Sequence, residues 1–303
     1  MKHKWVRLAF LVLLVLFVAG TIFMKRPSLR TKGYFVFFRA WYSHWPFATG
    51  KLLPNALAHY FEPFVPVWVH VEPGITMLLD PYDVVSGSII ASGKWEQESW
   101  QALEQHLPAG GTFIDVGADI GWYSLKAAKA VGPRGHVIAV EPNPETLPKL
   151  RENIRASGAG SVIIVAPVAS SDSDATLTLY AAPRENTGMS SLSLANASRL
   201  GGIDGSYQVR ARRLDDIARE AGVTRVDALK IDVEGAEFLV LKGAVEILDH
   251  YRPVIIVELS DDGLKPMGSS VAEVMAFMHA HRYIPTQHMQ PEENVEFVPV
   301  AAP

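Results

Sequence analysis

A glycine-rich turn flanked by two carboxylates is the part of the sequence whose residue types and spacing most clearly indicate ligand chemistry. Gly117 and Gly121 are separated by three residues, and Asp115 and Asp119 lie beside them. Glycines allow a chain to turn sharply and to approach a ligand closely. Two carboxylates would repel a pyrophosphate, whereas they suit a ligand that carries ammonium and sulfonium groups. We therefore expect a positively charged, nucleotide-like ligand at this turn.

The residues around this turn narrow the class of nucleotide. A dinucleotide site favours the pattern Gly-x-Gly-x-x-Gly, which differs from the spacing at Gly117 and Gly121, and the chain has no Gly-x-x-x-x-Gly-Lys-Ser/Thr loop for ATP. Glu141 follows the next apolar run and is suited to accept hydrogen bonds from the two ribose hydroxyls of an adenosine. A Rossmann-type fold that binds another nucleotide remains the alternative.

The elements that must position these residues alternate between short β-rich runs and longer helical patterns. Strands are expected at residues 112–116, 136–140, 162–165, 228–231, 254–258 and 296–300. Helices are expected at residues 120–130, 144–156, 214–221, 237–248 and 271–279, and residues 176–180 and 207–211 look like an inserted pair of strands. This alternation predicts an α/β fold with a mostly parallel sheet and helices on both faces.

Composition and charge exclude several classes of function. The 303-residue chain contains no cysteine, which excludes thiolate catalysis, disulfides and cysteine-based metal sites. Residues 1–32 hold seven basic residues and no acidic ones, so the remainder has 21 basic against 32 acidic residues, a net charge of −11. A body this acidic is a poor partner for nucleic acid.

The N-terminal segment has the pattern of a membrane anchor. Residues 8–24 form an uncharged apolar run of 17 residues, about 26 Å long as a helix, with basic residues on both sides. We expect a single-pass anchor. The alternatives are a signal peptide cleaved near Ala19 and Gly20, or a buried core helix. Because basic residues flank both ends, charge does not predict the orientation.

The next segment is rich in aromatic side chains. Residues 34–47 include eight aromatic residues among fourteen, which suit either the headgroup layer of a membrane or packing on the following domain. We accordingly divide the chain into an anchor with basic flanks at residues 1–32, an aromatic-rich juxtamembrane connector at residues 33–70, and one catalytic domain at residues 71–303.

An acidic string supplies the second motif. Residues 230–237 read Lys-Ile-Asp-Val-Glu-Gly-Ala-Glu, at the end of one expected strand and the start of a helix. Together with residues 115–121 (Asp-Val-Gly-Ala-Asp-Ile-Gly), this string resembles the FkbM family of S-adenosylmethionine-dependent methyltransferases. Residues 190–192, 213–216, 241–244 and 253–258 match further family segments in order. The resemblance covers about residues 71–300, and family members usually have Asn at the position of Asp119.

The resemblance implies a fold and a cofactor. It implies a Rossmann-like class I methyltransferase with a mostly parallel seven-stranded sheet, in which S-adenosyl-L-methionine binds beyond the carboxyl ends of the strands. The expected cofactor-binding residues are Asp115, Gly117, Ala118, Asp119, Gly121, Glu141, Pro142, Asn143, Ala169 and Ser170, the last two in a turn expected near the adenine.

The resemblance also implies a reaction class, since members of the family are similar to O-methyltransferases that act on hydroxyls of sugars and polyketides. Asp232, Glu234 and Glu237 are then the candidates for orienting or deprotonating the acceptor, and Glu258 at the end of the neighbouring strand is a candidate to join them. Our hypothesis is that Asp232 or Glu234 is the general base.

Alternatives exist for these residues. Glu234 and Glu237 are also placed to stabilise the start of the following helix through its dipole. Asp232 and Glu258 have oxygen ligands suited to a divalent metal, but the sequence offers no evident third ligand, so we assign no metal. A histidine is the other candidate base, and the late part of the chain contains His279, His281 and His288.

The expected partners are a hydroxyl-bearing acceptor, such as a sugar, glycan or lipid-linked molecule, and the membrane through the N-terminal segment. We expect no nucleic-acid partner, and the sequence does not indicate an oligomeric state. Since S-adenosylmethionine is made in the cytosol, the catalytic domain is expected on the cytoplasmic face. The alternatives are an inactive cofactor-binding scaffold and an NAD-dependent oxidoreductase.

Overall fold

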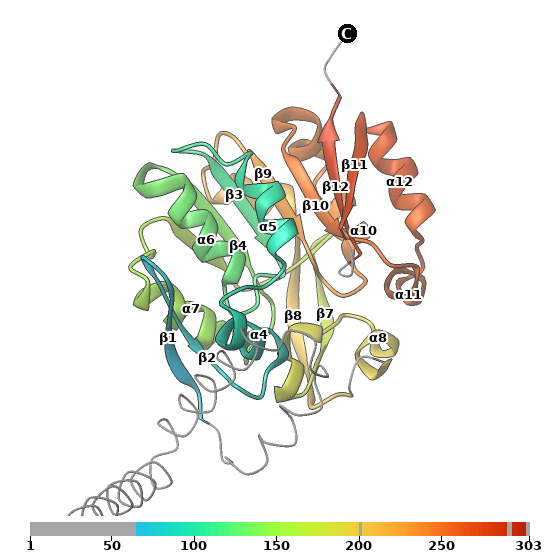
Figure 1. Cartoon of the computed structure of the whole chain (residues 1–303). Coiled ribbons are helices and arrows are strands. Elements are labelled where there is room, and N and C mark those ends of the chain that lie inside the picture. The colour runs from blue at the N-terminus through green and yellow to red at the C-terminus, as the bar shows by residue number, and fades with distance from the viewer. Residues whose placement is uncertain (1–64, 200–201, 290–292, 301–303) are drawn as a thin grey trace, which may run out of the picture. The chain divides into compact units, whose positions relative to one another are not determined.

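The structure, a computed structural model, describes residues 65–199, 202–289 and 293–300 (Figure 1). The expected anchor at residues 1–32, and the expected connector up to residue 64, lie outside these ranges. Within the described ranges, no helix is both long enough and apolar enough to cross a membrane.

Two compact units make up the chain. The first includes described residues 65–69 and 78–93, and its helix α4 (Val84–Ser92) begins at Asp83, whose carboxylate accepts a hydrogen bond from the Ser86 amide at 2.8 Å. The second includes described residues 70–77 and those from 94 to 300. Strands β1 (Val67–Glu72) and β2 (Ile75–Leu79) pair in a two-stranded sheet.

A seven-stranded sheet forms the centre of the second unit (Figure 1). Its order is β11 (Tyr283–Met289), β12 (Asn294–Pro299), β10 (Val254–Glu258), β9 (Ala228–Ile231), β3 (Thr112–Val116), β4 (His136–Val140) and β5 (Ile163–Ala166). Strands β5, β4, β3, β9 and β10 pair in parallel, and β12 runs antiparallel to its two neighbours. The predicted mostly parallel seven-stranded sheet is therefore confirmed.

Helices cover this sheet on both faces, as predicted. Side chains of a strand alternate between faces, and Ile114 and Val116 of β3 pack in one core with helices α9 (Leu214–Glu220), α10 (Glu237–Lys242) and α12 (Val271–Ala280). Phe113 faces the other way and is fully buried. Helices α5 (Gln97–Glu104) and α6 (Trp122–Val131) pack on that side. Further α-helices in the described part of the chain are α7 (Leu147–Ala156), α8 (Leu194–Arg199) and α11 (Asp261–Leu264).

The predicted inserted strands form a third sheet. Strand β8 (Gly205–Arg213) lies between β6 (Ala169–Ser171) and β7 (Ala175–Ala181), antiparallel to β7 and parallel to β6. The segment between β7 and β8 contains the 3-10 helix η2 (Arg184–Met189) and α8. This insertion follows β5 in the chain, so it lies at the carboxyl end of the main sheet, where a ligand is expected.

The sequence predicted the buried strands better than the ends of the helices. The bounds of β3, β4, β9 and β10 agree with the prediction. The helix predicted over 237–248 ends at Lys242, and a π-helical turn, η3 (Ile247–Tyr251), follows it. Short helices of this kind, like η1 (Gly132–Arg134) and η4 (Lys265–Met267), carry too few residues to give a periodic pattern.

Strand β11 was not predicted, and its position explains why. It contains Pro285, which lacks the amide hydrogen needed inside a sheet. The strand lies at the edge of the sheet, where one side of its backbone needs no partner, and its register against β12 shifts between Pro285 and Gln287. A proline that argues against an interior strand is thus compatible with an edge strand.

One buried carboxylate connects two distant segments of this unit. Asp215 in α9 is 3% exposed and accepts hydrogen bonds from the amides of Glu246 at 3.2 Å and Ile247 at 3.0 Å, while Arg213 donates to the same carboxylate at 2.8 Å. These contacts fix the start of the π-helical turn against α9.

We therefore expect Asp215→Ala to lower the free energy of unfolding by about 2 kcal/mol or more, because it leaves the buried Ile247 amide and the part-buried Glu246 amide without an acceptor. The neighbouring Asp216→Ala is a matched control, since Asp216 is bound by Arg219 at the surface, and we expect it to cost about 1 kcal/mol or less. Urea unfolding of both variants measures the difference, and equal losses would contradict the role of Asp215.

Candidate active site

The glycine turn after β3 is in direct contact with the acidic string after β9. Gly117 has φ +85°, and a Cβ atom added there would lie 1.8 Å from the carbonyl oxygen of Asp232. The Asp232 amide also donates to the carbonyl of Val116 at 3.0 Å. Any side chain at Gly117 would therefore separate the two strands, so the glycine is required by close packing as well as by the turn. The two sequence motifs thus form a single site.

Asp115 supports this turn from inside the fold. It is 2% exposed, and its carboxylate accepts a hydrogen bond from the Ser124 hydroxyl at 2.6 Å. Burial raises its pKa to about 6. The side chain connects the end of β3 to the first turn of α6, and it does not line the cavity described below. Asp115 therefore supports the loop, and its contact with the cofactor stays a prediction.

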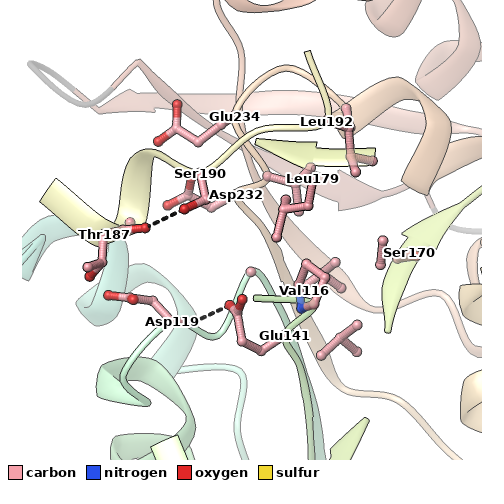
Figure 2. A pocket seen from close by; sticks show the side chains of 17 residues that line it. Val116, Asp119, Glu141, Ser170, Leu179, Thr187, Ser190, Leu192, Asp232 and Glu234 are labelled. Carbon is pink, nitrogen blue, oxygen red and sulfur yellow. Dashed lines mark hydrogen bonds between the residues drawn. The ribbon is translucent and has the colours of Figure 1, made fainter. Parts of the chain in front are cut away.

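Glu141 and Asp119 meet at the carboxyl end of β4 (Figure 2). The Glu141 carboxylate accepts hydrogen bonds from the amide of Asp119 at 2.9 Å and from the amide of Asn143 at 2.7 Å. Burial raises the pKa of Glu141 to about 7. Asp119 has φ +43°, a left-handed backbone that Asn and Asp tolerate better than most residues. This conformation is therefore compatible with Asp at a position where the resemblance led us to expect Asn.

A cavity of about 580 Å³ opens beside these residues (Figure 2). Its lining includes the predicted residues Gly117, Asp119, Glu141, Pro142, Ala169, Ser170, Asp232 and Glu234. The lining does not include the predicted residues Asp115, Ala118, Gly121, Asn143 and Glu237. Gly121 instead precedes α6, and Asn143 uses its backbone to hold Glu141.

The chemistry of this cavity fits an adenosine that carries an amino-acid arm. Val116, Leu179 and Leu192 supply apolar walls, and Glu141 supplies hydrogen-bond acceptors. The hydroxyl of Ser170 is buried and has no hydrogen-bond partner among the described residues, which leaves it available to a ligand. S-adenosylmethionine has the apolar and polar groups that such a lining requires.

The acidic string contains a buried ion pair. Lys230 is 3% exposed, and its Nζ donates to Asp232 at 2.6 Å and lies 3.4 Å from Glu96. Burial alone would lower the pKa of Lys230, but the carboxylates of Asp232 and Glu96 raise it well above its usual range. The ring of Tyr123 lies 4.6 Å from the same nitrogen, and its hydroxyl donates to Glu96 at 2.7 Å. This cluster fixes the Asp232 carboxylate at the edge of the cavity.

Glu234 differs from Asp232 in its surroundings. Burial and the nearby Asp232 and Glu237 carboxylates raise the pKa of Glu234 well above its usual range, which favours the neutral acid. Its backbone is left-handed, with φ +54°. It lines the 580 Å³ cavity and also a second cavity of about 470 Å³, which is bordered by Glu258, Ser260 and Gly263. Glu234 thus lies where the two cavities meet.

Glu237 turns back toward the loop that precedes it. It is 2% exposed, and one carboxylate oxygen accepts hydrogen bonds from the amides of Gly235 at 2.9 Å and Val233 at 3.2 Å. Burial raises its pKa to about 7. These contacts support the alternative in which Glu237 stabilises the start of the helix. Glu237 also borders the second cavity, so its part in the reaction stays a prediction.

Glu258 joins the acidic group, as expected. Oxygen atoms of Asp232, Glu234 and Glu258 lie within 4.8 Å of one another. Burial, and then Asp232 and Glu234, raise the pKa of Glu258 well above its usual range. Glu234 is therefore the third carboxylate beside Asp232 and Glu258, and the three oxygens are close enough together to hold a hard divalent cation.

The histidine alternative gains no support from the described side chains. His281 is hydrogen-bonded to Asp249 at 2.8 Å, and His279 is exposed in α12. Neither residue lines either of the two cavities. The side chain of His288 lies outside the described part of the chain.

Several residues of the site were missed by the sequence reasoning. Glu96, the residue before α5, and Tyr123 in α6 contact Lys230, and both lie outside the two motifs. Ser190 and Thr187 line the cavity from the insertion, and the Ser190 hydroxyl accepts a hydrogen bond from the Asn143 side chain at 3.1 Å. Only the Ser-Ser-Leu string at residues 190–192 had given a sequence signal for this segment.

Several known methyltransferases are similar to this chain. Hexuronic acid methyltransferase AglP of Haloferax volcanii is 27% identical over 161 residues, which cover 53% of this chain and 61% of that protein. 2-O-methyltransferase NoeI of Sinorhizobium fredii is 44% identical over 62 residues, 20% of this chain and 25% of that protein. The chain thus spans less than two thirds of each of these relatives. The crystal structure of methyltransferase FkbM from Methylobacillus flagellatus KT matches 70% of this chain and 52% of that chain, with 17% identity and a TM-score of 0.43.

A family model shows the family, and one further relative is also named as a methyltransferase. Methyltransferase sdnD of Sordaria araneosa is 29% identical over 199 residues, which cover 57% of this chain and 75% of that protein. The family model described as the methyltransferase FkbM domain matches residues 115–285, more than half of the chain and both motifs of the site. The chain therefore belongs to the FkbM methyltransferase family, and it is an S-adenosylmethionine-dependent methyltransferase.

Proposed function

We propose that this enzyme is an O-methyltransferase that methylates a hydroxyl of a sugar, within a glycan or a lipid-linked acceptor, at a membrane. The observation that carries the proposal is the position of Glu234, which lines both the cavity that fits the cofactor and the second cavity. The second cavity is bordered by Glu258 and Ser260, whose oxygens are suited to hydrogen-bond a polyhydroxyl compound. An acceptor held there would present its hydroxyl toward Asp232 and Glu234.

In this proposal, residues that follow β3 and β4 hold the cofactor together with residues of β6. Glu141 accepts hydrogen bonds from the ribose hydroxyls, since its carboxylate lines the cavity and is fixed by two amides. Ser170 and Ala169 lie against the adenine, where the unpartnered Ser170 hydroxyl gains a partner. Gly117 and Asp119 border the amino-acid arm.

Asp232 is the best candidate for the general base. The bound cofactor supplies an activated methyl group, so the protein has to align the acceptor oxygen and remove its proton. Asp232 lines the cofactor cavity and is ion-paired with Lys230, which stabilises its carboxylate. The raised pKa of Glu234 favours the neutral acid, which is suited to donate a hydrogen bond to the acceptor. Because a carboxylate is a weak base for a hydroxyl, proton transfer follows methyl transfer closely.

The acceptor class and the location are supported by different observations. Two similar proteins are named as a hexuronic acid methyltransferase and a 2-O-methyltransferase, which favours a sugar hydroxyl. The uncharged run at residues 8–24 favours membrane attachment. The cytosolic origin of S-adenosylmethionine favours a catalytic domain on the cytoplasmic face.

Simple measurements distinguish two other functions from the proposed methyl transfer. A catalytically inactive scaffold would bind the cofactor without transferring its methyl group to any glycan extract. An NAD-dependent oxidoreductase would gain thermal stability from NAD rather than from S-adenosylhomocysteine. The acidic cluster beside the cavity favours transfer chemistry over both alternatives.

For the proposed acceptor, we expect surface glycans or glycolipids of producing cells to lose one methyl group when the gene is deleted. Mass spectrometry of the carbohydrate and lipid fractions measures this change. In vitro, the purified full chain with isotopically labelled S-adenosylmethionine should restore the methyl group on the fraction from deleted cells. Transfer of the label only to non-carbohydrate material would contradict the sugar acceptor.

For the general base, Asp232→Asn should lower turnover by about a hundredfold or more, because it removes the carboxylate that takes the proton. Glu234→Gln should lower turnover by less than about tenfold, because an amide retains the donor of the protonated acid. Single-turnover kinetics on the labelled fraction gives the rates, and calorimetry with S-adenosylhomocysteine confirms cofactor binding. The opposite order of effects would assign the base to Glu234.

For the ribose contact, the affinity for S-adenosylhomocysteine should fall as pH decreases from 8 to 6. The pKa of Glu141 is about 7, so its ionised fraction decreases over this range and hydrogen-bond acceptors are lost. The limiting slope is about tenfold per pH unit. Glu141→Gln should bind more weakly and without this dependence.

Glu237 provides the matched control for this titration. Its pKa is also about 7, yet it does not line the cofactor cavity, and one oxygen makes both of its loop contacts. Glu237→Gln should therefore keep the pH dependence of S-adenosylhomocysteine binding. Loss of the pH dependence in Glu237→Gln, together with its retention in Glu141→Gln, would show that Glu237 rather than Glu141 is the titrating group.

A further inference from the structure

A buried asparagine in the insertion connects the two loops that carry the acidic group. Asn196 lies in α8 and is fully buried. Its side-chain nitrogen donates hydrogen bonds to the carbonyl of Glu234 at 3.0 Å and to the carbonyl of Gly263 at 2.8 Å. Glu234 follows β9, whereas Gly263 belongs to α11, which follows β10 and Glu258. One amide group therefore joins the chain segments after two neighbouring strands.

The two segments approach each other closely at this point. A Cβ atom added to Gly235, which has φ +106°, would lie 2.2 Å from the Asn196 nitrogen and 2.4 Å from the Gly263 carbonyl oxygen. A residue with a side chain would separate the loops. The absence of a side chain at Gly235 thus leaves the space that the Asn196 amide and the Gly263 carbonyl occupy.

Ser191 provides a second contact from the same insertion. Its hydroxyl donates to the Glu234 carbonyl at 2.7 Å and accepts from the amide of Ser193 at 3.0 Å. The Glu234 carbonyl thus has two donors from the insertion. The Ser193 hydroxyl in turn accepts a hydrogen bond from the backbone amide of Asn196 at 3.3 Å. The left-handed backbone of Glu234 is costly for a residue with a Cβ atom, so it persists only when its surroundings hold it.

We propose that Asn196, assisted by Ser191, is a positioning residue that holds the Glu234 backbone against the Gly263 loop and so keeps the Glu234 and Glu258 side chains together at the acceptor side of the site. Asn196 lines neither cavity, so it acts through Glu234 rather than by touching an acceptor. The inference rests on the proposed function only in taking Glu234 to contact the acceptor.

The geometry explains why asparagine is required. Two carbonyl oxygens lie within hydrogen-bond distance of one nitrogen, so the side chain must supply two N–H groups at that place. Asp would replace this donor with an oxygen and repel both carbonyls. Ala would leave both carbonyls without this partner, and Gln is one methylene too long for the space.

The first test requires no acceptor. Hydrogen exchange is measured on the full chain for Asn196→Ala, for Ser191→Ala, and for Ser198→Ala as a control, since Ser198 is an exposed residue of the same helix that bonds only within α8. We expect amide exchange at residues 233–236 and 261–264 to rise about tenfold in Asn196→Ala and less in Ser191→Ala, with no change in Ser198→Ala. Unchanged exchange in either segment would overturn the proposal.

The second test separates positioning from general stability. With the carbohydrate fraction that the wild type methylates, we expect turnover of Asn196→Ala to fall about tenfold or more while the KM for S-adenosylmethionine stays within about threefold. A parallel loss of cofactor binding, or full turnover, would overturn the proposal. If Asn196→Ala does not fold, Ser191→Ala decides by the same criteria. If the wild type methylates no carbohydrate, the proposed function fails, and hydrogen exchange still decides the positioning role.

Discussion

The site depends on the close approach of Gly117 to the carbonyl of Asp232. Parallel pairing of β3 and β9 aligns their carboxyl ends, and the Asp232 amide continues this pairing by donating to Val116. Because a Cβ atom at Gly117 would lie 1.8 Å from the Asp232 oxygen, the two loops can pack together only without a side chain at that position. The cofactor turn and the acidic group are therefore held at a fixed distance by main-chain contact rather than by flexible side chains.

Electrostatics then gives different charges to chemically similar groups. Asp232, Glu234 and Glu258 are close enough that full ionisation of all three would be costly. The one buried cation beside them among the described residues, Lys230, bonds directly to Asp232. Glu234 and Glu258 lack such a contact, and burial together with their acidic neighbours raises the pKa of both. A carboxylate and a neutral carboxylic acid thus lie side by side, which is the combination that a base and a hydrogen-bond donor require.

The sequence predicted those parts of the structure that depend on local patterns. Buried parallel strands such as β3 and β9 are short apolar runs that end in a motif, so both their bounds and the position of Glu141 could be predicted. The roles of Glu96 and Asn196 could not be predicted from the sequence, because their partners lie more than 35 positions away in the chain. Strand β11 was hidden by Pro285, and the predicted anchor at residues 1–32 lies outside the described residues.

Several acidic residues of the motifs hold the backbone of the loops in place. Asp115 bonds to Ser124, and Glu237 bonds to two amides of its own loop, so both carboxylates are used to hold the backbone. Left-handed residues such as Glu234 need this support, because their backbone is unfavourable unless neighbouring groups fix it. A sequence motif does not distinguish residues that hold the backbone from residues that take part in the reaction. The hydrogen-bond partners separate them: supporting side chains bind amides and carbonyls of the loops, whereas Asp232 and Glu234 line the cavity that fits the cofactor.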